Sequence, residues 1–485
     1  MFRTALKEMG ISPTFELLCI ILLGLGQMCI MTGYDTQSFI AESVLHAVNG
    51  REPTRIDTYA GYYGQATCYA SYMIACLFAP SVLTALSPKW TLFVGSVCFT
   101  IYQIGFLYLQ KYYYYASCVV MGIGFALYYA GHGAYLTSHS TRKSIERNSA
   151  IAWSIACLCM VVGSGILTII FSLNINSDRS MSSSSNSTES IVDGHRNGHE
   201  HAYRQFSDTE IRMMYGTFTA VTILSNIIFA TAPSSDIANC IEGKSSMAQK
   251  TFHKEMAMIW TTVIDKRMIT LMPLFFHLGF FTSFWISVYP TSLIFTKSLS
   301  DHIYLPAFYS LAIGIGEVAM GILISTMSKR FANFGLKPTM FIAFGLTTVL
   351  LCTVLLSVPP RATTEFTDDP TWLIEPSAAL STFAALLIGI ADSGVNNVRN
   401  VICALALPDG RAQAFAISKF YQASAGAMLM FLSPFFSIVH YAALLFFTLS
   451  LSTACFVHVA GQTIKLERLS SKKNLTITEE SVEKF

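Results

Sequence analysis

The sequence predicts an all-α membrane protein of twelve transmembrane helices arranged as two six-helix bundles. Three observations predict this class. First, 53% of the 485 residues are hydrophobic and only 12% are charged, whereas soluble domains carry roughly 25% charged residues. Second, apolar runs of about 18 or more residues, the length that spans a bilayer, recur along the chain. Third, one helix–loop–helix pattern occurs twice in the same orientation.

The repeat is visible in short matching segments. Residues 122–124 read Gly-Ile-Gly and residues 389–391 read Gly-Ile-Ala. Residues 147–152 read Arg-Asn-Ser-Ala-Ile-Ala, and residues 411–416 read Arg-Ala-Gln-Ala-Phe-Ala. In each copy a long apolar run leads into a short polar segment and then into a second apolar run. A pattern that recurs in the same order indicates a duplicated bundle.

Each apolar run should form a helix, because backbone polar groups cannot remain unpaired in lipid. The first run begins near Phe15 and lacks a small-residue cleavage site after it, so we expect a span rather than a removable signal peptide. The twelve expected spans are 15–37, 59–84, 90–109, 112–136, 148–172, 213–232, 268–296, 304–327, 338–357, 376–404, 413–432 and 441–463.

The distribution of basic residues predicts the orientation. With the N-terminus in the cytosol, the inner segments hold more than twice as many Lys and Arg residues as the outer ones, as the positive-inside rule requires. Both termini are then cytosolic. The protein itself lies in the plasma membrane or in an endomembrane. The predicted parts are a cytosolic N-terminus (1–14), an N-terminal six-helix bundle (15–232) with an outer loop (173–212), a central cytosolic linker (233–267), a C-terminal six-helix bundle (268–463) and a cytosolic tail (464–485).

Two of the predicted connecting segments carry a local signal. The outer loop contains Asn186 in an Asn-Ser-Thr sequon on the side where glycosylation occurs, so we expect a glycoprotein. In the central linker, apolar residues between Phe252 and Val263 fall on one helical face. That helix lies either in the headgroup plane or against the cytosolic ends of the bundle.

Span ten is the most polar of the predicted spans. Asp392, Asn396 and Arg399 recur at i, i+4 and i+7, which places them on one helix face. Charged groups at membrane depth are costly and mark functional sites by default. This face should therefore line the protein interior or water.

Two further ionisable residues lie at a similar depth. Glu317 in span eight and Lys419 in span eleven are expected within reach of Asp392, so Lys419 pairs with one of these acids. Three readings stay open: a structural ion pair, a substrate or proton-coupling site, and the lining of an inert cavity. Asp35 and Glu42 are expected near the outer end of span one. They form either an outer vestibule that attracts cations or part of a helix that extends beyond the bilayer into water.

Span four carries a polar face made of tyrosine and histidine side chains. Tyr128, His132 and Tyr135 recur at i, i+4 and i+7, and they form either a seam between helices or the wall of a cavity. No nucleotide-binding loop, nucleophile elbow or zinc-protease motif occurs in the sequence. We therefore expect no enzyme activity, catalytic residue, metal or cofactor, and no nucleic-acid partner.

Beyond these patterns, the chain resembles the Unc-ninety-three-like family of the major facilitator superfamily. The matching segments keep their order along nearly the whole chain. They are Gly61-Tyr62, Ala79-Pro80-Ser81, the glycine-rich run 121–136 with Arg147-Asn148-Ser149, Gly314-Ile315-Gly316-Glu317, residues 389–393 and residues 415–420. The sequence departs from the family at His132, where glutamine is usual.

The resemblance implies two functions. Members of this family act as a potassium-channel regulatory subunit and as an escort of nucleic-acid-sensing receptors, which implies a regulatory or trafficking partner of an ion channel or receptor. The superfamily implies the alternative, which is a secondary transporter of a small solute, with or without proton coupling. In such transporters spans four and ten line the cavity. The loop signature of ordinary transporters is reduced to Leu86-Ser87-Pro88-Lys89, which favours the partner role.

Overall fold

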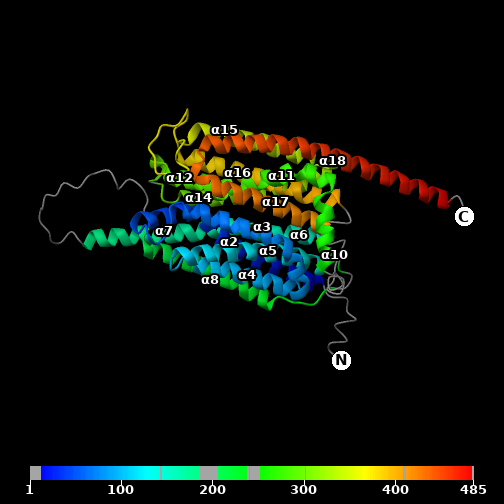
Figure 1. The fold of residues 1–485 in the computed structure, drawn as a ribbon, viewed down its shortest axis with the longest axis horizontal. Helices are drawn as coiled ribbons and strands as arrows, with labels where there is room; N and C mark the ends of the chain where they lie inside the picture. The colour runs from blue at the N-terminus through cyan, green and yellow to red at the C-terminus, as the bar shows by residue number, and fades with distance from the viewer. Residues whose placement is uncertain are drawn as a thin grey trace, which may run out of the picture.

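The computed structural model describes residues 13–141, 145–184, 206–237, 240, 252–300, 302–331, 333–407 and 411–482. Within these residues the chain is almost wholly helical, as predicted (Figure 1). Among the described helices, ten are long and apolar enough to cross a membrane, and α4 and α17 pack among them. The prediction of twelve helices in two six-helix bundles is confirmed.

The first bundle contains six helical spans, and the fifth is broken near Cys157. A helix that is apolar on nearly every side is stable here because lipid and protein both bury its surface. The elements are α2 (Pro13–Arg51), α3 (Ala60–Leu86), α4 (Pro88–Ile104), α5 (Lys111–Ser138), α6 (Ile145–Ala156) with α7 (Leu158–Ser184), and α8 (Asp208–Thr231).

The second bundle follows a short connecting helix, α10 (Phe252–Val263). Its first span contains a π-helical turn, and its last helix is the longest in the protein. The elements are α11 (Lys266–Ser283), η1 (Phe284–Val288) and α12 (Tyr289–Phe295), the short α13 (Lys297–Ser300), α14 (Leu305–Arg330), α15 (Lys337–Ser357), α16 (Ala378–Ala406), α17 (Arg411–Leu432), the 3-10 turn η2 (Ser433–Phe435) and α18 (Ile438–Val482).

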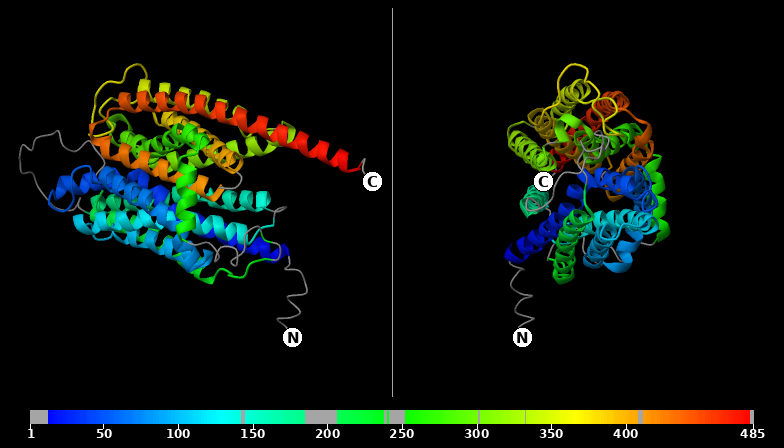
Figure 2. Two further views of the ribbon diagram at one scale, coloured as in Figure 1. Left: turned by 45° about the vertical axis from the view of Figure 1, so that its right-hand side comes forward. Right: turned by 90° about the vertical axis from the view of Figure 1, so that its left-hand side faces the viewer.

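The two bundles lie against each other with their helices roughly along a common axis (Figures 1 and 2). They meet chiefly where α3 packs on α17 and where α7 packs on α14. The start of α2 and the end of α18 lie at one end of the molecule, which we call the terminal end; the opposite end is the far end (Figure 1). Helix α10 crosses the terminal end and contacts α3, α11 and α17.

Of the two placements expected for the linker helix, α10 therefore has the packed one. Ile259 is buried against the bundle, whereas the neighbouring Trp260 is exposed.

The sequence repeat corresponds to a repeated helix contact. Gly122 of α5 lies against the backbone of α3: a Cβ there would be 2.2 Å from the carbonyl oxygen of Cys68 and 2.6 Å from the nitrogen of Tyr72. Gly389 of α16 lies against α14 in the same way, 2.1 Å from the Ile313 oxygen and 3.0 Å from the Glu317 nitrogen. Small residues permit such close helix packing in membranes. Each bundle therefore repeats one helix pair, α3–α5 in the first and α14–α16 in the second.

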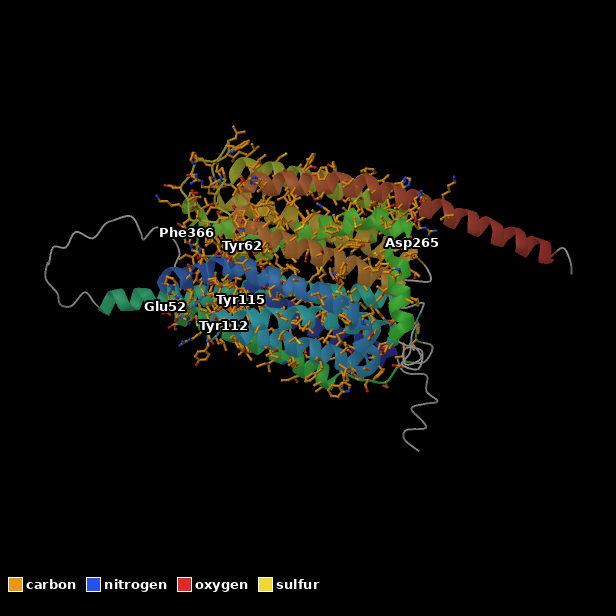
Figure 3. The ribbon with its side chains drawn as sticks, viewed as in Figure 1. Glu52, Tyr62, Tyr112, Tyr115, Asp265 and Phe366 are labelled. Atoms are coloured by element: carbon orange, nitrogen blue, oxygen red, sulfur yellow. The ribbon has the colours of Figure 1, made fainter. Side chains whose placement is uncertain are left out.

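The bundles are joined at the far end. The Tyr62 hydroxyl of α3 donates a hydrogen bond of 2.6 Å to the carbonyl oxygen of Thr363, in the loop after α15. His46 of α2 packs its ring on Phe295 and Phe366, with centroids 5.2 and 5.4 Å away. Tyr62 and Phe366 are labelled together at this end in Figure 3. The structure therefore closes the far end with contacts between the two bundles.

Two helices are longer than predicted. Helix α2 continues to Arg51 and α18 continues to Val482, so the predicted tail begins as helix. Neither expected role fits Glu42, which is 1% exposed and lies neither in a vestibule nor in water. One of its carboxylate oxygens accepts a hydrogen bond of 3.0 Å from the backbone nitrogen of Tyr62, in the first turn of α3. A carboxylate stabilises a helix N-terminus through the unpaired N–H groups and the helix dipole.

Candidate functional site

The centre of the site is Asp392 of α16, which is only 7% exposed. The indole nitrogen Nε1 of Trp285 donates to its Oδ1 at 3.0 Å, and the side-chain amide of Asn396 donates to its Oδ2 at 2.8 Å. Trp285 lies in the π-helical turn η1, and the Tyr309 hydroxyl donates to its backbone carbonyl. Single π-helical turns often occur at functional sites. Both oxygens of Asp392 thus have donors, as a buried carboxylate requires.

Arg399 lies two turns along the same face of α16 and is 5% exposed. Its guanidinium donates to Oε1 of Gln422 in α17 at 2.8 Å and to Oδ1 of Asn400 at 3.1 and 3.2 Å. Gln422 donates in turn to Thr282 of α11. The polar face predicted on span ten therefore faces the protein interior, and its buried cation is held by neutral amides.

Lys419 does not form the expected ion pair with Asp392 or Glu317. Its ammonium lies over the ring of Tyr129, 4.5 Å from the centroid, which is the geometry of a cation–π contact. Lys419 belongs to α17 and Tyr129 to α5, so this contact crosses between the bundles. No ion-pair contact joins Lys419 to Asp392 or Glu317 among the described residues.

Three carboxylates come together in the structure. Asp392 lies one turn along α16 from Gly389, which packs against the Glu317 nitrogen of α14. Asp35 of α2 and this part of α14 both border the start of α7: Oδ2 of Asp35 lies 3.9 Å from the Sγ of Cys159, and a Cβ at Gly314, one turn from Glu317, would be 2.7 Å from the Cβ of Met160. The acids come from both bundles, so the group lies where the bundles meet. We call these three acids, with Asn396, Arg399, Lys419 and Tyr129, the central cluster.

The residues expected on span four point elsewhere. Tyr128 is fully buried and contacts the rings of Phe99 and Phe229, in α4 and α8. His132 is half-buried beside Tyr128. Tyr135 is buried, and its hydroxyl donates to the carbonyl oxygen of Pro233 at 2.9 Å. These three side chains lie in a seam within the first bundle, whereas Tyr129, one residue along, faces the central cluster.

The helix repeat relates the side of the central cluster formed by the first bundle to the side formed by the second. When the contact at Gly122 is aligned with the contact at Gly389, three pairs of residues occupy equivalent positions: Tyr72 and Glu317, Phe125 and Asp392, and Tyr129 and Asn396. In the first bundle these positions form a layer of rings, with Phe125 and Tyr129 parallel to within 8° and Tyr72 beside both. The second bundle has two carboxylates and an amide at the same positions. One wall of the site is therefore aromatic and the other is ionisable.

Sequence reasoning misplaced one member of the site and missed three others. Asp35 was expected at the outer end, because α2 was expected to end much earlier than Arg51. Trp285 and Gln422 lie in apolar runs that carry no charge signal. Tyr129 could have been found by aligning it with Asn396 through the repeat. Asn186, the glycosylation candidate, lies outside the described residues. Among the described residues, no group of three His, Cys, Asp or Glu side chains could hold a metal ion.

Comparison with known proteins identifies the family. Residues 52–457 match the sequence profile of the family described as "Ion channel regulatory protein UNC-93". The chain belongs to the UNC-93 family. It is 25% identical over 440 residues to the UNC93-like protein MFSD11 of Xenopus laevis, covering 87% of this chain and 90% of that one. It is 24% identical over 286 residues to UNC93-like protein 1 of Arabidopsis thaliana, covering 58% and 56%.

The fold is that of major facilitator transporters. The peptide transporter POT, in complex with alafosfalin, superposes with a TM-score of 0.56 at 10% identity, covering 93% of this chain and 95% of that one. The Escherichia coli fucose:proton symporter FucP gives a TM-score of 0.52 at 10% identity, covering 92% and 98%. These likenesses show the fold alone, since fold does not fix function. The predicted membership of the UNC-93 family and the predicted fold are both confirmed.

Proposed function

We propose that this UNC-93 family member is a regulatory or trafficking partner of an ion channel or receptor. The observation that carries the proposal is the family match over residues 52–457, to a family described as ion channel regulatory proteins. The chain is embedded in the lipid bilayer through helices that extend across the whole match. The names of its relatives are those of UNC93-like proteins and transporters rather than enzymes, so we propose a non-catalytic role.

Co-purification tests this proposal. The full chain is tagged at its C-terminus, solubilised in mild detergent from a membrane where it is naturally expressed, and its partners are identified by mass spectrometry. We expect a channel or receptor subunit in near-stoichiometric amount and a changed ion current when the chain is deleted. A tagged transporter of the same fold, expressed equally, is the control. Recovery of the chain alone, with unchanged currents on deletion, would refute the proposal.

A second candidate, secondary transport of a small solute, is favoured by the central cluster. Charges buried between two bundles are expensive, and such a cluster lies where a solute would bind in this fold. The test is uptake of a panel of radiolabelled solutes by cells expressing the chain, with surface delivery measured in parallel. Asp392→Asn should abolish uptake without loss of delivery, and Asp369→Asn, an exposed loop residue, is the matched control. Uptake unchanged in Asp392→Asn would exclude this site.

We also propose the orientation expected from the basic residues. The terminal end would face the cytosol, with residues 1–14, the linker 233–267 and the tail 464–485 on that side, and the outer loop 173–212 would carry glycan at Asn186. The placement of the start of α2, the end of α18 and α10 at one end is compatible with this (Figure 1).

A further inference from the structure

The central cluster contains groups that already have partners and groups that do not. Asp392 receives two hydrogen bonds, from Trp285 and Asn396, and Arg399 donates to two amide oxygens. These two residues need no further ligand. The other charged residues of the cluster are Asp35, Glu317 and Lys419, and each is half-buried rather than fully buried. Each of these three side chains therefore keeps some accessible surface.

The two remaining acids have no strong donor. Glu317 makes no hydrogen bond or ion pair within the described part of the chain, and Asp35 has only the weak donor Sγ of Cys159, at 3.9 Å. The two acids come from different bundles and border the same segment of α7. A cation between two such carboxylates stabilises both and supplies donors for their lone pairs. An ammonium group supplies three donors and one positive charge.

The remaining base has no acceptor. The Lys419 ammonium lies on the face of Tyr129 and makes no hydrogen bond to any side chain or carbonyl that the structure describes. Tyr72, which is 5% exposed and stacks on Tyr129, has a buried hydroxyl with only the weakly polar Cys76 thiol beside it. An anionic group beside Lys419 would supply acceptors for both the ammonium and this hydroxyl.

The acidic and basic groups flank one aromatic surface. The rings of the first bundle connect the two sides: Phe125 packs on Tyr34, the residue before Asp35, at 4.7 Å between centroids, and Tyr129 lies under the Lys419 ammonium. Phe125 lies parallel to Tyr129, 6.1 Å away between centroids, and is itself buried at 6% exposed. A ligand that reaches both the acids and Lys419 would pass the half-buried Tyr129 ring, and apolar atoms on the ligand would be favoured there.

We infer that the central cluster binds a small zwitterion, with its ammonium group between Asp35 and Glu317, its carboxylate on Lys419 and its apolar part on the Tyr129 ring. This inference deepens the second candidate function and rests on its premise that the cluster binds a solute, whether or not the solute is carried across. A ligand with only a positive charge would leave Lys419 without an acceptor, and one with only a negative charge would leave both acids without donors. Buried groups left unpaired in this way oppose binding.

Thermal stabilisation of the purified full-length chain in detergent tests the inference. The probes are L-phenylalanine and the dipeptide L-alanyl-L-phenylalanine, two zwitterions that differ in the separation of their charges. Phenethylamine and 3-phenylpropionate keep the ring and one charge each. Since a hydrogen bond to a charged group contributes about 1.5–3 kcal/mol, loss of either charge should weaken binding roughly 10- to 100-fold. We expect one of the zwitterions to stabilise the chain at concentrations where neither single-charge probe does.

Variants then identify which residue meets which charge. In Lys419→Gln the preference for the carboxylate should vanish, so that phenethylamine binds as well as the zwitterion. In Glu317→Gln the preference for the ammonium should fall instead, and 3-phenylpropionate should approach the zwitterion. Lys297→Gln, a half-exposed lysine in the far-end ion pair with Asp368, is the control and should keep the wild-type preference. A variant that does not fold gives no reading, but the other variant and the wild-type probe series still decide.

The possible outcomes distinguish failure of the zwitterion inference from failure of the proposed transport function. If phenethylamine binds as tightly as the zwitterions and its binding depends on Glu317, the inference of a zwitterionic ligand is wrong. The cluster would then be a site for a cationic solute. Stabilisation by a zwitterion that is unchanged in both cluster variants would move its binding elsewhere and refute the inference. If no probe stabilises the wild-type chain, the inference fails, while uptake measured with Asp392→Asn still decides the transport function on its own.

Discussion

Replacement of Gly389 by alanine should loosen the contact between α14 and α16. A Cβ at this position would lie 2.1 Å from the Ile313 carbonyl oxygen and 3.0 Å from the Glu317 nitrogen, where ordinary contact begins at 3.4 Å. Both atoms belong to the backbone of α14, so no side-chain rotation can relieve the overlap. The two helices would have to move apart by about 1 Å, and such overpacking costs about 1–3 kcal/mol.

Part of this cost is recovered. Alanine is favoured over glycine inside a helix by about 0.5–1 kcal/mol. From the middle of both ranges, the net loss of stability should be about 1 kcal/mol, a factor of roughly 5 in the ratio of folded to unfolded protein. Gly321→Ala on α14 is the matched control, because a Cβ there meets nothing within 4 Å. It should be neutral or slightly stabilising.

The assay is thermal denaturation in detergent, followed by fluorescence-detected size-exclusion chromatography. The expected order of midpoints is Gly389→Ala below wild type, and Gly321→Ala at or above it. The equivalent change in the first bundle, Gly122→Ala, should behave like Gly389→Ala, because its Cβ would be 2.2 Å from the Cys68 oxygen. A Gly389→Ala chain as stable as wild type would refute the close approach of α14 and α16, and with it the structural repeat.

Three further predictions concern other parts of the chain. Tyr62→Phe removes the donor to the buried Thr363 carbonyl; it should cost about 1–3 kcal/mol and speed hydrogen–deuterium exchange in the far-end loop after α15, and unchanged exchange there would argue against the closure. Glu42→Ala should lower the denaturation midpoint more than Glu42→Gln, because glutamine keeps an oxygen acceptor for the first turn of α3; equal effects would show that the hydrogen bond contributes little. Glycosidase should change the mobility of the wild-type chain but not of Asn186→Gln, and a shift that persists in the variant would contradict the proposed orientation.

Much of the architecture could be predicted from the sequence. The length of each apolar run determines a helix that can span the bilayer, because unpaired backbone groups are excluded from lipid. The repeated glycines at 122 and 389 indicated a duplicated bundle, and they mark the same helix contact in both halves. The i, i+4, i+7 spacing of Asp392, Asn396 and Arg399 placed these residues on one face, and that face does lie inside the protein.

The rotation of each helix could not be predicted. Hydrophobic periodicity distinguishes core from surface in a soluble helix, but in a membrane the lipid is as apolar as the core, so the signal is weak. On α5 the expected face contained Tyr128, whereas the structure directs Tyr129 to the centre and packs Tyr128 against α4 and α8. One residue is a rotation of about 100° on a helix, enough to exchange a cavity wall for a seam.

From the sequence alone one can conclude that this is a membrane protein built from two copies of one helix bundle, with its ionisable groups concentrated in the second copy. These properties follow from the length of the apolar runs, the spacing of residues and the distribution of charge, and the family follows from the resemblance of the motifs. Which groups meet depends on the tertiary structure. Asp392 accepts a hydrogen bond from Trp285 within the second bundle, and Lys419 lies over the ring of Tyr129 in the first bundle; in both cases the partners are far apart in the chain and are brought together by helix packing. Neither partner could be read from spacing, because a buried charge is stabilised by whichever polar or aromatic group the packing brings within reach.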